Sequence, residues 1–252
     1  MITIAPATVY AVVAIFCRIG GCLMIAPGFS SVQIPARIRL FIALAVSLAL
    51  TPLLIDTVRP LTGDGSPGTL AGLIFSELAA GLLIGFLARL FFAALETISA
   101  AITQAIGLGA IPGTLDEDLQ NVPTLGVLFT LTATTVMFIT GLHVQLIRGL
   151  LDSYTAIPPG QTFASRPALV DIVDQVSAAF FVALRIGSPF IVYSIVVNFA
   201  IGITNKLTPQ IPVFFIATPF IIAGGLLLVL ITVREFVEYF DTAFAAWLLR
   251  GG

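Results

Sequence analysis

Long apolar stretches alternate with short polar connections along this chain, and the alternation predicts where its helices lie. The apolar stretches cover residues 7–27, 38–55, 70–111, 123–151, 168–205 and 209–250. A helix that crosses a bilayer needs about 17–25 mostly apolar residues, and each stretch is long enough. The pattern therefore predicts an all-α, membrane-associated protein of long, kinked helices and helical hairpins, with about six apolar segments.

Two of these stretches do not fit a simple crossing. Residues 70–111 contain no proline, and one continuous helix of this length would measure about 60 Å, twice the hydrocarbon thickness. We expect either a break near residues 93–96 or a helix that does more than span the membrane. The last stretch is apolar as far as residue 233, and acidic residues then alternate with Phe and Trp. This ending predicts an amphipathic helix against a partner or the membrane interface.

Composition agrees with a membrane protein. Hydrophobic residues make up 58% of the chain and charged residues 10%, with a mean hydropathy of +1.11. Soluble domains carry about 25% charged residues. The net charge of −2 gives no basic surface for nucleic acid. Residues 1–17 contain no Lys or Arg, so we expect the first apolar stretch to be retained rather than cleaved as a signal peptide.

Small and charged residues recur at four-residue steps in the third stretch. The predicted helix-packing stripe consists of Glu77, Gly81, Gly85 and Arg89. The glycine pair permits close helix approach, and ordinary helix packing explains it. Glu77 and Arg89 are three turns apart and cannot pair with each other. Charges inside a membrane are costly, so we expect both side chains to face protein, each with another partner. Arg18, in the middle of the first stretch, is expected to face protein as well.

The polar segment at residues 107–122 separates two long apolar stretches. Its helix-breaking residues are Gly107, Gly109, Pro112 and Gly113. Its acidic residues are Asp116, Glu117 and Asp118. Three carboxylates in a row are too few for a calcium site, and acidic residues at the start of a helix are the more ordinary interpretation. The segment must lie at one end of the helical bundle.

A second polar interruption predicts a helical hairpin. Pro209 and Pro212 lack the backbone donor that a helix interior needs. We therefore expect one helix to stop near Leu207 and another to start near Pro212. Lys206, the only lysine of the chain, would sit at an exposed or partner-facing hairpin tip.

The sequence shows no catalytic or metal-binding motif. The sequence contains no H-E-x-x-H, G-x-S-x-G, P-loop or dinucleotide fingerprint. His143 has no Cys or His in ligand spacing, and Cys17 and Cys22 would point in different directions on one helix. We expect no enzyme activity, no metal, no cofactor and no disulfide.

Specific residues resemble the family of the flagellar biosynthesis protein FliR, an export-gate subunit of type III secretion systems. The stretch from residue 198 to residue 219 reads Asn-x-x-x-Gly-x-x-x-Lys-x-x-Pro-Gln followed by Phe-x-x-x-x-Pro. Shorter matches lie near residues 26–39 and 107–143. The residues that carry the resemblance are Pro27, Pro35, Arg37, Arg39, Gly141, His143, Asn198, Gly202, Lys206, Pro209, Gln210, Phe214 and Pro219.

The resemblance implies a core subunit at the flagellar basal body in the bacterial inner membrane. It would assemble with FliP and FliQ into a gate, contact FlhB and FlhA, touch membrane lipids and pass unfolded flagellar proteins. Residues 1–165 would form a FliP-like unit and residues 166–252 a FliQ-like hairpin. Residues 107–122 would lie in the channel mouth and help close it, with Ile111 and Leu115 as small apolar plugs.

A small secondary transporter or channel acting alone is the alternative. Its apolar segments would be broken by Pro and Gly at a substrate site, as at residues 187–189 and 218–225. Such a transporter should show paired interruptions in two repeats, and the two halves of this chain do not align. A transporter works alone or as a homo-oligomer, whereas a gate subunit purifies with its partners.

Overall fold

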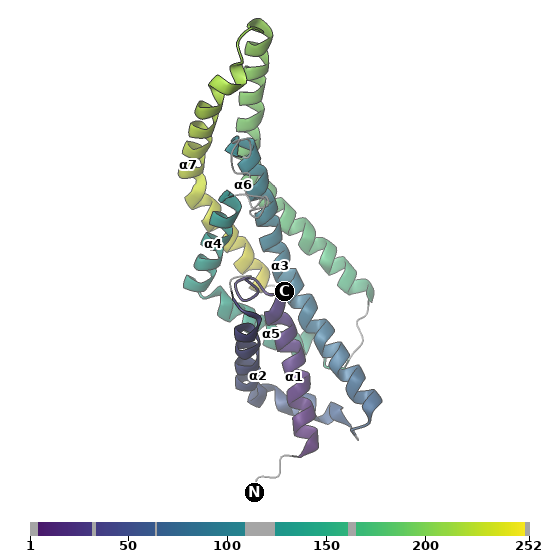
Figure 1. Ribbon diagram of the computed structural model, residues 1–252. Helices are drawn as coiled ribbons and strands as arrows, with labels where there is room; N and C mark the ends of the chain where they lie inside the picture. Colours follow the sequence, from purple (N-terminus) through teal and green to yellow (C-terminus); the bar gives the residue numbers. More distant parts are fainter. Residues whose placement is uncertain (1–4, 32–33, 64, 109–123, 161–164, 250–252) are drawn as a thin grey trace. The chain divides into compact units, whose positions relative to one another are not determined.

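The computed structural model describes residues 5–31, 34–63, 65–108, 124–160 and 165–249 (Figure 1). Helices account for the regular structure of these ranges, which contain no strand. In chain order the elements are α1 (Pro6–Ile25), α2 (Ala36–Val58), the 3-10 helix η1 (Arg59–Thr62), α3 (Pro67–Ala105), α4 (Thr124–Ile139), α5 (Leu142–Ala156), α6 (Ser165–Leu207) and α7 (Val213–Leu249). The all-α prediction is confirmed.

The described helices match the predicted apolar segments. Five of them are long and apolar enough to cross a membrane, and α4 and α5 together form a sixth, bent candidate. Prolines mark several boundaries, as their missing backbone donor requires. Helix α1 begins with Pro6, α2 follows Pro35 and α3 begins with Pro67. The predicted ends of the hairpin are also confirmed, because α6 ends at Leu207 and α7 begins at Val213.

Helix α3 is one element of 39 residues, so the break considered near residues 93–96 does not occur. The hydroxyl groups of this region form hydrogen bonds within the helix. Thr97 Oγ1 donates to the Ala93 carbonyl at 2.8 Å, and Thr103 Oγ1 donates to the Ser99 carbonyl at 2.8 Å. The other expectation, a helix too long for a simple crossing, is confirmed.

Three boundaries differ from the sequence prediction. The stretch at residues 123–151 is not one segment: α4 and α5 meet at an angle of 72°, and Gly141 takes a left-handed φ of +77° at the break. Glycine tolerates this conformation without a Cβ clash. The loop expected at residues 56–69 is shorter, because α2 and η1 extend to Thr62. The loop expected at residues 152–167 is also shorter, since α5 runs to Ala156 and α6 starts at Ser165.

The chain forms two compact units that interleave along the sequence. The first unit takes residues 1–90, 141–176 and 245–252, and the second takes residues 91–140 and 177–244. This division is spatial. The division into FliP-like residues 1–165 and FliQ-like residues 166–252 rests on resemblance and stays a prediction.

The core of the second unit is aromatic. The rings of Phe92 and Phe240 meet edge to face with centroids 5.2 Å apart, and Phe92 contacts Phe244 in the same way at 5.7 Å. Phe129 of α4 stacks on Phe236 of α7 at 4.4 Å. The buried Phe side chains of α7 share one face of a helix whose Arg234 is exposed. The ending of the chain is amphipathic, as predicted, but its Phe side chains pack against α3 and α4 of the same chain and not against a partner or the membrane interface.

Candidate functional site

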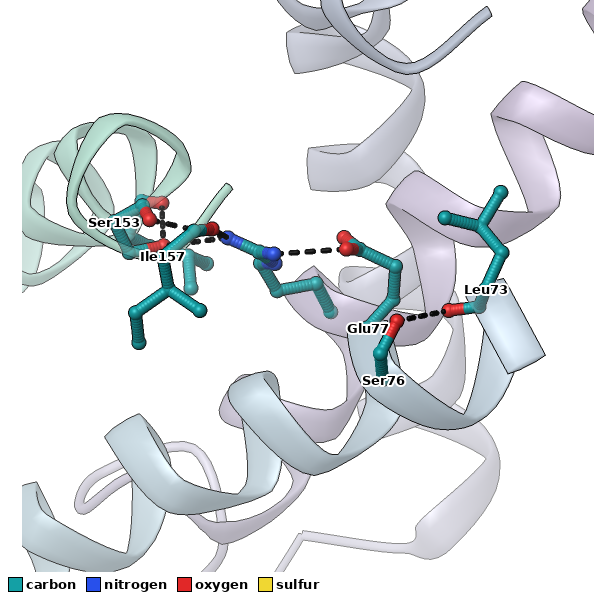
Figure 2. A network of polar contacts seen from close by, with 7 residues as sticks. Leu73, Ser76, Glu77, Ser153 and Ile157 are labelled. Carbon is teal, nitrogen blue, oxygen red and sulfur yellow. Dashed lines mark hydrogen bonds and ion pairs between the residues drawn. The ribbon is translucent and has the colours of Figure 1, made fainter. Parts of the chain in front are cut away.

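A buried ion pair joins α1 to α3 inside the first unit. Arg18 lies within α1 and is 1% exposed, and Glu77 lies on α3 and is 0% exposed. Arg18 Nη2 donates to Glu77 Oε1 at 2.8 Å. Figure 2 shows the hydrogen bonds around this pair, with Glu77 on one side and Ser153 and Ile157 on the other. The expectations that Arg18 and Glu77 face protein, and that Glu77 has a partner other than Arg89, are confirmed.

Helix α5 supplies the remaining contacts of the guanidinium. Arg18 Nη1 donates to the Ser153 carbonyl at 3.2 Å and to the Ile157 carbonyl at 3.0 Å. These carbonyls lie where α5 ends, and the negative end of a helix dipole favours a cation. The guanidinium carbon also lies 4.1 Å from the centre of the Tyr154 ring, within cation–π range. One arginine thus ties three helices together.

Glycines on α3 bring its backbone against α1. A Cβ on Gly81 would lie 2.0 Å from the Arg18 carbonyl oxygen, and a Cβ on Gly85 would lie 2.6 Å from the Cys22 carbonyl oxygen. Any larger residue would force the two helices apart. The close approach predicted for this glycine pair therefore exists, and the neighbour is α1 of the same chain. Glu77 occupies the next step of the same stripe, so the packing places its carboxylate beside Arg18.

Arg89, the last residue of the stripe, has a different environment. It is exposed, and its Nη1 donates to Ser30 Oγ at 3.1 Å. Arg89 thus has a partner in this chain other than Glu77, as expected, but because it is exposed the expectation that it faces protein and not lipid stays a prediction.

The residues of the 198–219 pattern lie on the hairpin formed by α6 and α7 (Figure 1). All of them are exposed: Asn198, Gly202, Lys206, Pro209, Gln210, Phe214 and Pro219. Lys206 is in the last turn of α6, which confirms its predicted place at an exposed tip. The pattern is therefore not a packing motif within the described part of the chain.

The other residues of the family pattern lie in the first unit, at or near the ends of helices. Pro27 is buried directly after α1, and Pro35 precedes α2. Arg39 Nε donates to the Ile34 carbonyl at 3.0 Å, whereas Arg37 is exposed. Gly141 forms the break before α5, and the half-buried His143 follows in its first turn. Their signature role stays a prediction.

The predicted channel-closing loop lies mostly outside the described residues. This applies to Gly109, Ile111, Pro112, Gly113, Leu115, Asp116, Glu117 and Asp118. Only its start is described, where Gly107 adopts a φ of +79°. There the end of α3 packs on α7, because a Cβ on Gly225 would lie 2.4 Å from Ile106 Cβ.

Sequence reasoning missed several residues with structural roles. Ser153, Tyr154 and Ile157 hold Arg18, but nothing in their types marks them as its partners. The available signal was the pair of lone, opposite charges in two apolar stretches. In the second unit, Gly187 and Gly224 allow close contacts with Ile98 and Tyr193. Tyr193 Oη donates to the Ile221 carbonyl at 2.7 Å and joins α6 to α7.

The polar contacts described above hold helices in position. In the second unit a cleft of about 690 Å³ between α6 and α7 is lined by Arg185, Tyr239 and acidic residues of α7. Arg185 Nη1 donates to Tyr239 Oη at 3.3 Å, with its guanidinium carbon 4.7 Å from the ring centre. Across the described ranges no three His, Cys, Asp or Glu side chains gather in a way that could hold a metal ion. The arrangement holds helices in register.

Comparison with known proteins identifies the family. The model for "Bacterial export proteins, family 1" matches residues 9–247. Flagellar biosynthetic protein FliR of Caulobacter vibrioides is 31% identical over 86% of this chain and 86% of its own length. FliR of Escherichia coli is 24% identical, over 83% of this chain and 78% of its own. Yop proteins translocation protein T of Yersinia pestis is 30% identical, over 69% of this chain and 68% of its own length.

These matches cover the first unit and the hairpin alike, and they confirm the resemblance drawn from the 198–219 pattern. The chain belongs to family 1 of the bacterial export proteins, the family that includes FliR.

Proposed function

We propose that this chain is a core subunit of a flagellar type III export gate and helps to form and close the channel for unfolded flagellar proteins. The observation that carries the proposal is the family match over residues 9–247, together with FliR relatives aligned along most of the chain. A FliR-like role is favoured over a lone transporter, because the match is to export proteins and runs through every described helix.

The apolar surface of the chain supports a membrane location and contact with partner subunits. The chain is a multi-pass membrane protein by the length and apolar character of its helices. We place it in the bacterial inner membrane, at the flagellar basal body. Large apolar side chains are exposed along α6 and α7, among them Phe199, Phe215 and Phe220 at 70–74%. Such surfaces need lipid or partner subunits, and we assign FliP and FliQ as gate partners and FlhB and FlhA as further contacts.

Helix length supports a larger assembly. Helices α3, α6 and α7 contain 39, 43 and 37 residues, so each measures about 55–65 Å. A hydrocarbon core is about 30 Å thick. A gate whose helices extend beyond the bilayer accommodates this length, whereas upright spans of one chain in lipid would leave apolar residues in water.

Affinity purification tests the assembly. The tagged chain is isolated from native membranes in mild detergent and its partners are identified by mass spectrometry, with a tagged, unrelated multi-pass protein as the control. We expect FliP and FliQ in stoichiometric amounts. Recovery of the chain alone, or as a homo-oligomer, would contradict the proposal. Loss of flagellin export in a strain lacking the chain would separate flagellar from injectisome use. The Yersinia pestis relative is named as a translocation protein for Yop proteins.

A deletion tests the closing role of residues 107–122. Removal of residues 109–113 shortens the loop while α3 and α4 remain. We expect the gate to assemble and the membrane to leak, because the shortened loop cannot fill the channel mouth. The measurement is ion conductance or small-molecule uptake in cells that also express the partner subunits. A deleted form that assembles and stays sealed would show that this loop is a simple turn.

A further inference from the structure

Two arginines of the first unit converge on one serine. Arg89 Nη1, on α3, donates to Ser30 Oγ at 3.1 Å, and Arg39 Nη1, on α2, donates to the Ser30 carbonyl at 3.5 Å. Arg39 Nε also donates to the Ile34 carbonyl at 3.0 Å. Ser30 lies in the connection between α1 and α2. The packing of three helices therefore brings two positive charges to one point.

No carboxylate offsets these two charges in the described part of the chain. The ion pairs of that part lie elsewhere, between α1 and α3 and within α7. Arg39 and Arg89 are thus like charges held on one residue, and like charges at short range repel each other. Arg89 is exposed and Arg39 is only half-buried, so an anion from outside the chain can reach them. Such an anion would offset the repulsion, and the forked guanidinium suits the oxygens of a phosphate.

An exposed apolar stripe on α3 begins beside Arg89. It consists of Phe86, Leu82, Leu78 and Phe75, which lie three, seven, eleven and fourteen residues before the arginine. This spacing puts them on one side of the helix, and each side chain is 38–74% exposed. From Arg89 to Leu78 the stripe measures about 16 Å, close to half of a hydrocarbon core of about 30 Å. Its length therefore matches one leaflet of a bilayer.

The direction of α3 relates this stripe to the arginines. Helix α3 runs beside α1 in the same direction (Figure 1), because Gly81 approaches Arg18 and Gly85 approaches Cys22. Arg89, one step further, reaches the connection that follows α1. The apolar stripe extends from there back along α3, a helix apolar enough to cross a membrane. The two arginines thus lie at one end of the apolar surface, where long basic side chains of membrane proteins reach the headgroup region.

We propose that Arg39 and Arg89 bind the phosphate of one anionic phospholipid, whose acyl chains lie along the exposed stripe of α3. Basic pockets between membrane helices are typical sites for anionic headgroups. A soluble anion or an acidic protein loop would meet the charges but leave the apolar stripe uncovered, whereas a lipid meets both. Arg89 would then face Ser30 and a headgroup, where the sequence predicted protein alone. The inference does not depend on the export function, because it rests on the contacts of this chain.

Lipid titration tests the site on the chain as purified in mild detergent with the subunits that accompany it. Native mass spectrometry measures the affinity for phosphatidylglycerol and for phosphatidylcholine with the same acyl chains. We expect tighter binding of phosphatidylglycerol, and inorganic phosphate in excess should not displace it. Equal affinity for the two lipids, or displacement by inorganic phosphate, would overturn the proposal.

Substitution of Arg89 tests the role of the arginines. Arg89→Gln should weaken the binding of phosphatidylglycerol by about fivefold or more, because one cation near the headgroup is lost. Arg89→Lys keeps the charge and should retain most of the affinity. Arg148→Gln removes an exposed arginine of α5 in the same unit and is the matched control. Unchanged affinity in Arg89→Gln, or an equal loss in the control, would contradict the assignment.

An electron cryomicroscopy map of the same preparation, in nanodiscs that contain phosphatidylglycerol, identifies the occupant directly. We expect density for a phosphate in contact with Arg39 and Arg89, and density for an acyl chain along Phe86 and Leu82. Absence of this density would overturn the proposal. A carboxylate of a partner subunit in its place would do the same, because the arginines would then serve a protein contact.

Discussion

Arg18 and Lys206 both interrupt apolar sequence with one positive charge, yet their environments differ completely. Arg18 is buried in the first unit and bound by a carboxylate, two carbonyls and an aromatic ring. Lys206 is exposed on the last turn of α6, beside the short connection to α7. The first charge organises the chain's own helices. The second lies on a surface that the described part of the chain leaves open, and we propose that the first region serves folding and the second serves assembly.

This division explains why the glycines of the two regions also differ. A Cβ added at Gly81 or Gly85 would overlap the backbone of α1. A Cβ added at Gly202 on the hairpin would have nothing within 4 Å. Close backbone contact inside the chain requires glycine at the first pair. Nothing in the described part of the chain requires glycine at Gly202, so any such requirement must come from outside these residues.

The largest effect should come from Gly81→Ala. The added methyl group would lie 2.0 Å from the Arg18 carbonyl oxygen, and the obstacle is backbone that cannot rotate away. We expect destabilisation of about 3 kcal/mol or more, at the upper end of overpacking effects. Denaturant unfolding of the purified protein measures it. Gly72→Ala, on the same helix with open space around it, is the control and should be neutral or slightly stabilising.

Gly85→Leu is expected to act in the same way. It should disturb the contact between α3 and α1 before it affects any partner subunit. If either Gly81→Ala or Gly85→Leu proved as stable as the Gly72 control, the close approach of the two helices would be refuted.

Loss of the buried carboxylate should have an effect of similar size. Glu77→Ala leaves Arg18 buried without its counter-charge, which typically costs about 3–5 kcal/mol. Glu96→Ala, an exposed carboxylate on the same helix, should change the free energy of unfolding little. Replacing both partners, in Arg18→Met with Glu77→Leu, should recover much of the loss because no charge then remains buried. A double variant no more stable than Glu77→Ala alone would argue against a direct pair.

At the hairpin tip, Lys206→Glu should leave the fold intact and impair function. The side chain is exposed, so we expect the free energy of unfolding to change by less than about 0.5 kcal/mol. Reversed charge should weaken contact with partner subunits, which can be measured as reduced flagellin export and swimming. Lys206→Arg keeps the charge and should retain export. Normal export by Lys206→Glu would remove the functional argument for the tip.

The smallest effect should be seen at a second ion pair. Arg234 Nε contacts Glu238 Oε1 at 2.9 Å, nearly the same distance as the buried pair, but the side chains are 85% and 65% exposed. Exposed pairs four residues apart contribute little because water screens them. We expect Arg234→Ala to unfold at the same denaturant concentration as the unmodified protein. A clear loss of stability would show that the distance between the charges, and not their burial, determines what an ion pair contributes.

The sequence predicted the helices better than their contacts. Proline positions and apolar length were enough to place the ends of α1, α6 and α7, because both act locally. The break at Gly141 was not predicted, since glycine in an apolar run is compatible with either a helix or a left-handed turn. The continuity of α3 was left open because the length of an apolar stretch does not say whether it forms one helix or two.

The pairing of Arg18 with Glu77 needed the fold. Each residue was expected to face protein, but the choice of partner depends on which helices are neighbours and in what register. Gly81 and Gly85 set that register by letting α3 approach α1, and the end of α5 adds its carbonyls from a distant part of the chain. No spacing within one helix contains this information.

One measurement tests the division between folding and assembly most directly: the amount of FliP recovered per molecule of tagged chain, set beside the level of the chain in the membrane. Glu77→Ala should lower the level of the chain, while the surviving folded molecules bind FliP in the normal ratio. Lys206→Glu should keep the level of the chain and lower the ratio. If Glu77→Ala lowered the ratio without affecting the level of the chain, and Lys206→Glu did the opposite, the roles assigned to the two regions would be contradicted.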